Sequence, residues 1–334
     1  MANPDPDIRF NPLPFDDPHN IRNWAEWVRA SLYLSTFMRR FYWQSASSPD
    51  RVDLWFQVRA PSGAPGAPTS GDNPYNQFAV IARPSADAFR AQVRFLHQYA
   101  DQRPERSAEI MSQVGFPSAY FLTLMGMIVG RNRHLIELMT ITQVISAHVA
   151  MVVKHALACR RPDEIDATVM PMIPTPGHSA FPSAHATEAF SVARLLHGVI
   201  DQHPDHFSDA DSARRLVRKQ AERIAVNRTV AGVHFPIDSW AGAALGTAIG
   251  DIILALCGHG TSFNAPRYAE NGLTHPQNID FSIHRMDDAH LSEQAGLRRG
   301  DAVAVADPDP LFQWLWARMA GELYPAPIGS SQGQ

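Results

Sequence analysis

The segment Pro174-Thr-Pro-Gly-His-Ser-Ala-Phe-Pro-Ser-Ala-His-Ala-Thr-Glu188 joins a loop to the start of a helix. Three prolines and a glycine between Pro174 and Pro182 exclude a helix there, and the residues after Pro182 follow a helical pattern. We therefore expect the backbone N–H groups of residues 183–185 to be free at the start of this helix. A helix N-terminus of this kind binds anions, because its N–H groups point outward and its dipole favours negative charge.

Basic side chains lie on both sides of this segment. Lys154 and Arg161 precede it and are seven residues apart, about two helical turns, which predicts that they share one helix face. Arg228, His234 and Asp238 follow it. The last two are four residues apart, so the carboxylate can accept a hydrogen bond from the imidazole and fix its tautomer. Each feature alone also fits ordinary helix-end chemistry, but together they indicate a cationic cage around one oxyanion.

The composition is that of a globular chain. Its 334 residues are 45% hydrophobic and 19% charged, and the formal net charge is −4. The basic residues are scattered, so we expect no nucleic-acid partner. Cys159 and Cys257 are far apart, which favours reduced thiols over a disulfide. No secretory signal is visible at the N-terminus, and this predicts a cytoplasmic location, with export by another route left open.

The hydrophobic patterns predict a mostly α-helical fold, a large helical bundle. We expect an irregular N-terminal arm over 1–20 and a single helical domain over 21–330, with the oxyanion site in 151–240 and a loop excursion at 45–75, partly disordered at 60–73. Two apolar stretches, 135–158 and 240–257, contain charged residues and fall short of about 18 clean apolar residues. They therefore predict buried helices, and no membrane partner is expected. Helices are expected at 21–43, 85–102, 106–114, 119–130, 134–158, 184–201, 209–227, 237–257, 289–297 and 310–323.

Three ordered motifs carry a resemblance to a known superfamily. They read Lys-x6-Arg-Pro from residue 154, Pro-Ser-x-His from 182 and Arg-x5-His-x3-Asp from 228. In this order they resemble the superfamily shared by vanadium-dependent haloperoxidases and type-2 phosphatidic acid phosphatases, including bacterial acid phosphatases. The resemblance implies a helical fold of that type around one oxyanion site, and it covers about a quarter of the chain.

The resemblance also implies a role for each matching residue. Three cations would neutralise the oxyanion, and the start of the helix would hydrogen-bond its oxygens. One histidine would bind the central vanadium or phosphorus atom, and the other would act as general acid–base opposite it. The cations are Lys154, Arg161 and Arg228; the oxygen-binding groups are the Ser183 hydroxyl and the Ala184 N–H; the axial ligand is His234, oriented by Asp238; the acid–base is His185.

Two positions depart from the pattern of this superfamily. Ala184 stands where glycine is usual, and Asn227 stands where serine is common. Alanine keeps the N–H donor but disfavours a positive φ. If the glycine conformation were needed, the geometry around the oxyanion would be altered.

The same cage serves two chemistries, and the sequence favours the peroxidase. The absence of a visible signal peptide or membrane span, together with the long region before Lys154, predicts a vanadium-dependent haloperoxidase with vanadate as cofactor; phosphate can occupy the same site. Its partners would be hydrogen peroxide, a halide and a small organic acceptor, with Lys154 polarising the bound peroxide. By resemblance, His178 suggests bromide or iodide in preference to chloride, and a solvated loop histidine is the alternative explanation.

Two other functions stay open. The first is an acid phosphatase working through a phosphohistidine on His234, with His185 protonating the leaving alcohol. The second is a non-catalytic oxyanion-binding protein in which Ala184 prevents turnover. The tryptophans and the long N-terminal region also permit a homodimer.

Overall fold

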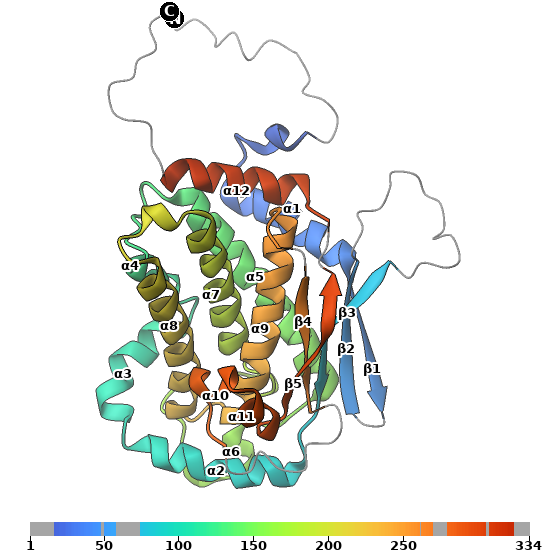
Figure 1. Cartoon of the computed structure of the whole chain (residues 1–334). Coiled ribbons are helices and arrows are strands. Elements are labelled where there is room, and N and C mark those ends of the chain that lie inside the picture. Colours follow the sequence, from blue (N-terminus) through green and yellow to red (C-terminus); the bar gives the residue numbers. More distant parts are fainter. Residues whose placement is uncertain are drawn as a thin grey trace, which may run out of the picture.

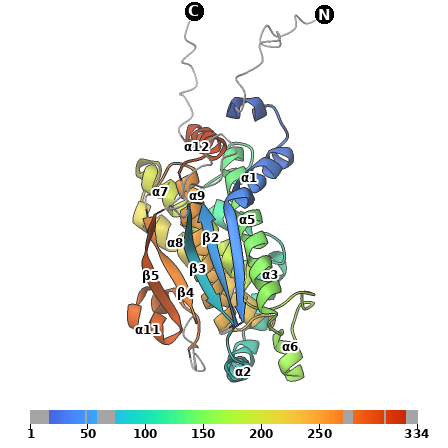
Figure 2. The same cartoon turned by 90° about the vertical axis from the view of Figure 1, so that its right-hand side faces the viewer.

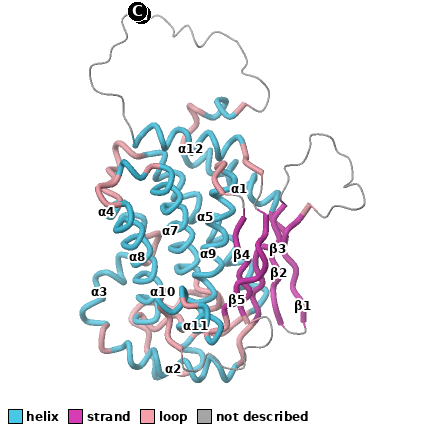
Figure 3. Tube along the Cα trace, viewed as in Figure 1, coloured by secondary structure: helices cyan, strands magenta, loops and turns pink. Residues whose placement is uncertain are grey.

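The computed structural model describes residues 17–47, 50–57, 74–260, 262–269, 279–304 and 307–323. It is mostly helical, as expected, but a sheet lies along one side of the helices (Figures 1 and 3). The helices are α1 (Glu26–Arg40), α2 (Ala86–Ala100), α3 (Arg103–Ser112), α4 (Ser118–Leu124), α5 (Arg133–Leu157), α6 (Pro162–Ile165), α7 (Ala184–Gln202), α8 (Ala210–Val230), α9 (Pro236–Leu256), α10 (Ile283–Asp287), α11 (Ala289–Gln294) and α12 (Pro310–Leu323). Short 3-10 turns cover Pro18–Ile21, Ala167–Val169 and Pro204–His206.

Helix α7 is the centre of the helical part and packs against α5, α8 and α9 (Figure 1). Its contact with α9 is the closest, because Gly242, Gly246 and Gly250 of α9 lie at a four-residue spacing on one face. A Cβ added at Gly242 would lie 2.6 Å from the carbonyl oxygen of Ser183. The small residues of α9 therefore allow the backbones to approach and fix α9 against the start of α7.

We predict that Gly242→Ala lowers the free energy of unfolding by about 1–3 kcal/mol, because the new methyl group overpacks the contact with Ser183. The matched control is Gly321→Ala in α12, where an added Cβ meets no atom within 4 Å. That control is expected to be neutral or to stabilise by about 0.4–1 kcal/mol. Urea unfolding of both variants checks this, and equal stability of the two would contradict the packing described.

The five-stranded sheet was not predicted, although the chain is mostly helical as expected. Its strands are β1 (Phe41–Ser47), β2 (Asp50–Gln57), β3 (Tyr75–Ala82), β4 (Ser262–Tyr268) and β5 (Leu297–Ala304). They lie in the order β1-β2-β3-β4-β5, and neighbours are antiparallel except the parallel pair β3–β4. Figure 2 shows the sheet face on, with helices behind it. Helix α9 packs against β3 and β4, and α5 packs against β2.

The prediction of a loop excursion at 45–75 is therefore wrong for the residues in this range that form β1, β2 and the start of β3. Helix α1 ends at Arg40, and the aromatic run Phe41-Tyr-Trp43 begins a strand, because aromatic side chains fit a pleated surface. The predicted disorder at 60–73 and the arm over 1–16 lie outside the described residues. Within the predicted arm, Pro18–Ile21 forms a 3-10 turn capped by the Asp17 side chain.

Two helices are long and apolar enough, by length and composition, to cross a membrane. The segments are Arg133–Ile165 and Pro236–Leu256, and 61% and 89% of their apolar windows are buried inside the fold. Both segments contain charged residues and most of each apolar window is buried, which agrees with the prediction of buried helices. Core helices of globular proteins pass the same test, and the cellular location stays a prediction.

Candidate active site

Helix α7 begins where the sequence predicts, but the expectation that the N–H of residue 183 is free is wrong. Ser183 is the N-cap, and its hydroxyl accepts a hydrogen bond from the Ala186 N–H at 3.3 Å. The Ser183 N–H donates to the carbonyl oxygen of Asp238 at 2.9 Å. The start of α7 is thereby joined directly to the first turn of α9, which positions the two motifs relative to each other.

Ala184 occupies the first helical position of α7 and is buried. The non-glycine residues with positive φ in the described part of the chain are Ala158, Met170 and Ala269. Ala184 is not among them, so its backbone needs no glycine conformation. Its N–H lies in the first turn, where a helix offers no internal acceptor, and this donor remains suited to an anion.

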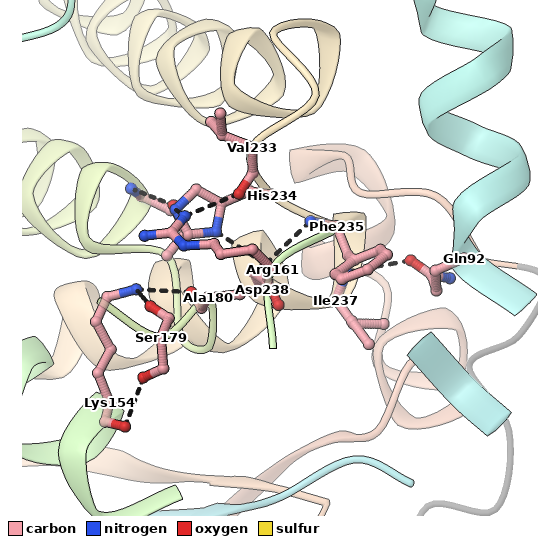
Figure 4. Close-up of polar contacts among 12 residues, drawn as sticks. Gln92, Lys154, Arg161, Ser179, Ala180, Val233, His234, Phe235, Ile237 and Asp238 are labelled. Carbon is pink, nitrogen blue, oxygen red and sulfur yellow. Dashed lines mark hydrogen bonds and ion pairs between the residues drawn. The ribbon is translucent and has the colours of Figure 1, made fainter. Parts of the chain in front are cut away.

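Lys154 and Arg161 both reach the loop that precedes α7 (Figure 4). The Lys154 ammonium donates to the carbonyl oxygens of Ser179 and Ala180, at 2.7 and 2.6 Å. The Arg161 guanidinium donates through Nε to the His178 carbonyl and through Nη1 to the Val233 carbonyl, each at 2.8 Å. Both cations are almost fully buried, at 1% and 2% exposure.

The prediction that Lys154 and Arg161 lie on one face of the same helix is wrong. Helix α5 ends at Leu157, Ala158 adopts a left-handed conformation with φ 48°, and Arg161 caps the short helix α6. Lys154 and Arg161 therefore do not share a helix face. They converge because the chain turns at Ala158 and brings Arg161 back over the same loop.

Arg228 supplies the third cation from the last turn of α8. Its Nη2 donates to the Ile110 carbonyl at 3.2 Å, while Nε and Nη1 are buried and have no hydrogen-bond partner within the described residues. Burial lowers the pKa of Arg228 to about 10, so it stays charged at neutral pH. Buried N–H groups without partners are costly, and a bound oxyanion would satisfy them.

His234 and Asp238 form the pair that their spacing predicts. His234 Nδ1 lies 2.8 Å from Asp238 Oδ2, and the same oxygen accepts the Phe235 N–H at 3.0 Å. Because a carboxylate accepts, Nδ1 carries the proton and Nε2 keeps its lone pair. The Arg161 Nη1 lies 3.1 Å from that Nε2. The Nε2 lone pair therefore points toward the Arg161 guanidinium, as Figure 4 shows.

His185 lies in the first turn of α7, and its Nε2 is 2.9 Å from the carbonyl oxygen of Gln113. Burial, followed by the charge of Arg228, lowers the pKa of His185 to about 4. One turn further along, burial raises the pKa of Glu188 to about 8, against the charge of Lys154. At neutral pH, His185 is thus mostly neutral and Glu188 mostly protonated.

His178 lies at the exposed edge of this group of residues. Its Nδ1 is 3.1 Å from Arg161 Nη2, so the ring contacts a cage cation although the side chain is open to solvent. His178 also lines a surface pocket of about 520 Å³ together with Arg160, Asp163 and Thr175. The structure thus places all the predicted site residues together and puts His178 at the rim.

The site is electrostatically unbalanced without an anion. Three cations are buried here; Glu109 is the carboxylate that acts on Arg228, and the buried carboxylate beside Lys154 and Arg161 is Asp238. Burial raises the pKa of that carboxyl, and Lys154, the Phe235 N–H and Arg161 oppose this shift. Burial and the charge of Arg161 lower the pKa of Lys154. A dianion would compensate the excess positive charge, which is the property required of a phosphate or vanadate site.

We predict that binding of a tetrahedral dianion takes up as much as about one proton near pH 7–8. An anion favours the charged form of its neighbours, so the pKa values of Lys154 and His185 rise when it binds. Sulfate is a suitable probe, because it does not titrate in this range. Calorimetric titration in two buffers of different ionisation enthalpy measures the uptake. Affinity should fall as pH rises, and binding without proton uptake at any pH from 6 to 9 would contradict this account.

The contribution of the α3 end to the site could not be predicted from the three motifs. Gln113, which follows this helix, is fully buried and contacts both His185 and Arg228. It lies 41 residues before Lys154, outside the three motifs, in a stretch with no distinctive spacing. The backbone carbonyls that hold Lys154 and Arg161 were also not predictable, because they depend on the loop conformation.

Comparison with known proteins supports the superfamily and not the finer branch. Residues 133–258 match the family model of the PAP2 superfamily, so the chain contains a PAP2 superfamily domain, a type whose members include phosphatases. Lys154, Arg161, Arg228, His234 and Asp238 all lie within it. The haloperoxidase branch expected from the sequence is not confirmed.

Among solved structures, a transmembrane PAP2-type phosphatidylglycerolphosphate phosphatase from Bacillus subtilis is similar, with 18% sequence identity and a TM-score of 0.41. The alignment covers 50% of this chain and 84% of that one. No curated protein matches the chain.

Proposed function

We propose that this protein hydrolyses phosphate esters through a phosphohistidine formed on His234. The observation that supports the proposal is the way in which both ring nitrogens of His234 are held. Asp238 holds its Nδ1–H at 2.8 Å, and its Nε2 lone pair points to the Arg161 guanidinium at 3.1 Å. A histidine held in one tautomer beside buried cations is suited to attack a phosphorus atom. The choice of phosphate ester over peroxide is supported by the PAP2 superfamily match.

In this reaction, each residue of the cationic cage has a separate role. Lys154, Arg161 and Arg228 bind the phosphoryl oxygens, and the start of α7 donates further hydrogen bonds. His234 Nε2 forms the bond to phosphorus while the ester oxygen leaves and takes a proton from His185, which is protonated in the complex because the bound dianion raises its pKa. Water then attacks the phosphohistidine and gives a proton back to His185, which releases phosphate and restores His234.

The contact between Arg161 and His234 has a consequence for substrate entry. In the structure, Arg161 Nη1 donates to the Nε2 lone pair that must attack phosphorus. An incoming phosphoryl group offers oxygens that accept more strongly from a guanidinium than an imidazole does. Arg161 therefore turns from the imidazole to the substrate, and the nucleophile becomes free when the anion arrives.

A vanadium-dependent haloperoxidase is the second candidate, and His178 is the observation that favours it. Its ring contacts Arg161 at 3.1 Å and is open to solvent, which suits a residue meeting a halide. The partnerless N–H groups of Arg228 and the Nε2 lone pair of His234, which faces Arg161, also fit vanadate. Vanadate would be held by Lys154, Arg161, Ser183, Ala184 and Arg228, with His234 as its ligand. When bound, it supplies Lewis-acid activation of hydrogen peroxide toward bromide or iodide.

A non-catalytic binding protein has less support, because its argument depended on Ala184. This residue takes an ordinary helical conformation, so the exchange of glycine for alanine introduces no strain. Ala184 thus gives no reason to expect a site that binds without turnover.

One set of assays distinguishes the candidates. The purified protein should release phosphate from an aryl phosphate without added vanadate, and orthovanadate should inhibit it. Protein quenched during turnover should carry an acid-labile phosphate on the peptide that contains His234. No hydrolysis, combined with bromination of a dye in the presence of orthovanadate, hydrogen peroxide and bromide, would overturn the first proposal in favour of the second.

A further inference from the structure

The carboxy-terminal end of α3 contacts the cage although it lies outside the PAP2 domain. Gln113 is the C-cap of this helix and is fully buried. Its carbonyl oxygen is 2.9 Å from His185 Nε2, and its side-chain Oε1 is 3.4 Å from Arg228 Nη2. One residue thus contacts two cage residues that come from different helices, α7 and α8.

The contact with His185 fixes which nitrogen carries the proton. A backbone carbonyl can only accept a hydrogen bond, so the Nε2 of His185 must be the protonated nitrogen. The neutral imidazole then has its lone pair on Nδ1. Any proton that His185 exchanges with a substrate or water must therefore pass through Nδ1, while Nε2 stays bound to Gln113.

The contact with Arg228 fixes how the guanidinium is presented. Its Nη2 is held by the Ile110 carbonyl and by Gln113 Oε1, at 3.2 and 3.4 Å. Both acceptors come from the last turn of α3. They hold one nitrogen and leave Nε and Nη1, which have no partner in the described residues, for the anion.

Hydrogen bonds to both the nitrogen and the oxygen of the Gln113 amide fix its orientation. Its Nε2 donates to Glu109 Oε1 at 3.0 Å, and its Oε1 accepts from Asn227 Nδ2 at 2.9 Å. The Asn227 Oδ1 in turn accepts from Arg106 Nη1 at 2.9 Å. A flipped amide would place its NH2 group against Arg228 and Asn227, so only one orientation satisfies every partner. Asn227, which departs from the usual serine, is the bridge from α8 to this amide.

We infer that Gln113 is a positioning residue of the site. Its carbonyl keeps the exchangeable nitrogen of His185 at Nδ1, and its side-chain amide aims Arg228 at the bound anion. The end of helix α3 thereby fixes the position of His185 on α7 relative to Arg228 on α8. The catalytic consequence rests on the proposed function, whereas the tautomer and the anion affinity can be measured without turnover.

The first test uses Gln113→Met, which keeps the size and the backbone carbonyl but removes the amide. Phosphate affinity, measured by calorimetry, should fall about 10- to 100-fold, because a hydrogen bond to a charged group is lost in a buried network. The matched control is Gln143→Met. Gln143 is also a fully buried glutamine, but it bonds to Ser118, not to the cage. It should bind phosphate as the unmodified protein does.

The second test uses Gln113→Glu and separates positioning from a merely structural role. When protonated, the new carboxyl can reproduce both contacts, accepting from Arg228 and donating to Glu109; when ionised, it opposes the anion. The loss of phosphate affinity relative to the unmodified protein should therefore grow with pH, whereas the loss in Gln113→Met should be constant.

A long-range nitrogen–proton correlation spectrum of the histidine rings tests the tautomer directly. His185 should show the proton on Nε2 in the unmodified protein. A proton on Nδ1 instead, or wild-type phosphate affinity in folded Gln113→Met, would overturn the inference. If the unmodified protein binds no phosphate, both the oxyanion site and the proposed role of Gln113 in orienting Arg228 are wrong. Phosphate binding with the expected tautomer but no hydrolysis would leave this inference standing and refute only the proposed function.

Discussion

Replacing His234 with alanine should lower the rate of phosphate-ester hydrolysis by about 10⁴- to 10⁶-fold, the range expected when a covalent nucleophile is removed. Its Nε2 is the nitrogen that forms the bond to phosphorus, and its partners, Asp238 and Arg161, cannot replace it. Stopped-flow or long-incubation assays with an aryl phosphate measure the loss, and the acid-labile phosphate on the quenched protein should disappear as well.

The control for His234→Ala is Ser239→Ala. Ser239 follows Asp238 in the first turns of α9 and is fully buried, and its hydroxyl has no hydrogen-bond partner within the described residues. Removing it should leave both turnover and phosphate binding close to the starting values. If His234→Ala keeps more than a few per cent of the activity while Ser239→Ala behaves as expected, another residue is the nucleophile.

Asp238→Asn should have the second largest effect, and it should separate binding from chemistry. The amide oxygen can still accept from His234 Nδ1 and the Phe235 N–H, so the hydrogen bonds at Oδ2 can persist. What disappears is the negative charge that stabilises the positive imidazole formed when His234 bonds to phosphorus. We expect kcat to fall by about 10²–10⁴-fold.

Anion binding should change in the opposite direction in this variant. Without the Asp238 carboxylate, the cage holds three cations and no buried negative partner, so phosphate should bind as tightly as before or more tightly. Titration calorimetry with phosphate gives the affinity, and initial rates give kcat. A parallel loss of affinity and kcat would show that Asp238 mainly supports the fold.

The helices that carry the cage could be predicted because their signals are local. Pro182 and Ser183 mark the start of α7, and the glycines and alanines of α9 predict close packing. The spacing of His234 and Asp238 predicted their hydrogen bond, because one turn of helix brings such residues together. These features depend on residues near one another in sequence, where propensity and spacing carry the information.

The sheet could not be predicted, because its pairing joins distant segments. Strand β3 pairs with β4 through Val80 and Arg267, almost 190 residues apart in the chain. The alternation Val52, Leu54, Phe56 in β2, with all three side chains buried, was a local sign of a strand. It was obscured by the Pro- and Gly-rich stretch that follows it in the sequence.

The site shows the same division between local and distant information. The motifs supply the cations and the two histidines, but they do not contain Gln113, whose buried contacts come from another part of the chain. Arg161 was placed in the site for an incorrect reason, since it reaches the cage through the left-handed turn at Ala158 and not along a helix face. The motifs therefore supplied the set of candidate residues, and the way in which these residues converge required the structure.

The central claim is that Lys154, Arg161, Arg228 and His234 converge on one oxyanion. Calorimetric titration of the protein with orthovanadate tests it most directly, because vanadate is an inhibitor in the first proposed chemistry and the cofactor in the second. We predict one vanadate site per chain and competition with phosphate. Arg228→Ala should lose binding by at least about 100-fold, because the Nε and Nη1 of its buried guanidinium have no other partner in the described residues. No binding, or binding that is unchanged in both Arg228→Ala and His234→Ala, would contradict it.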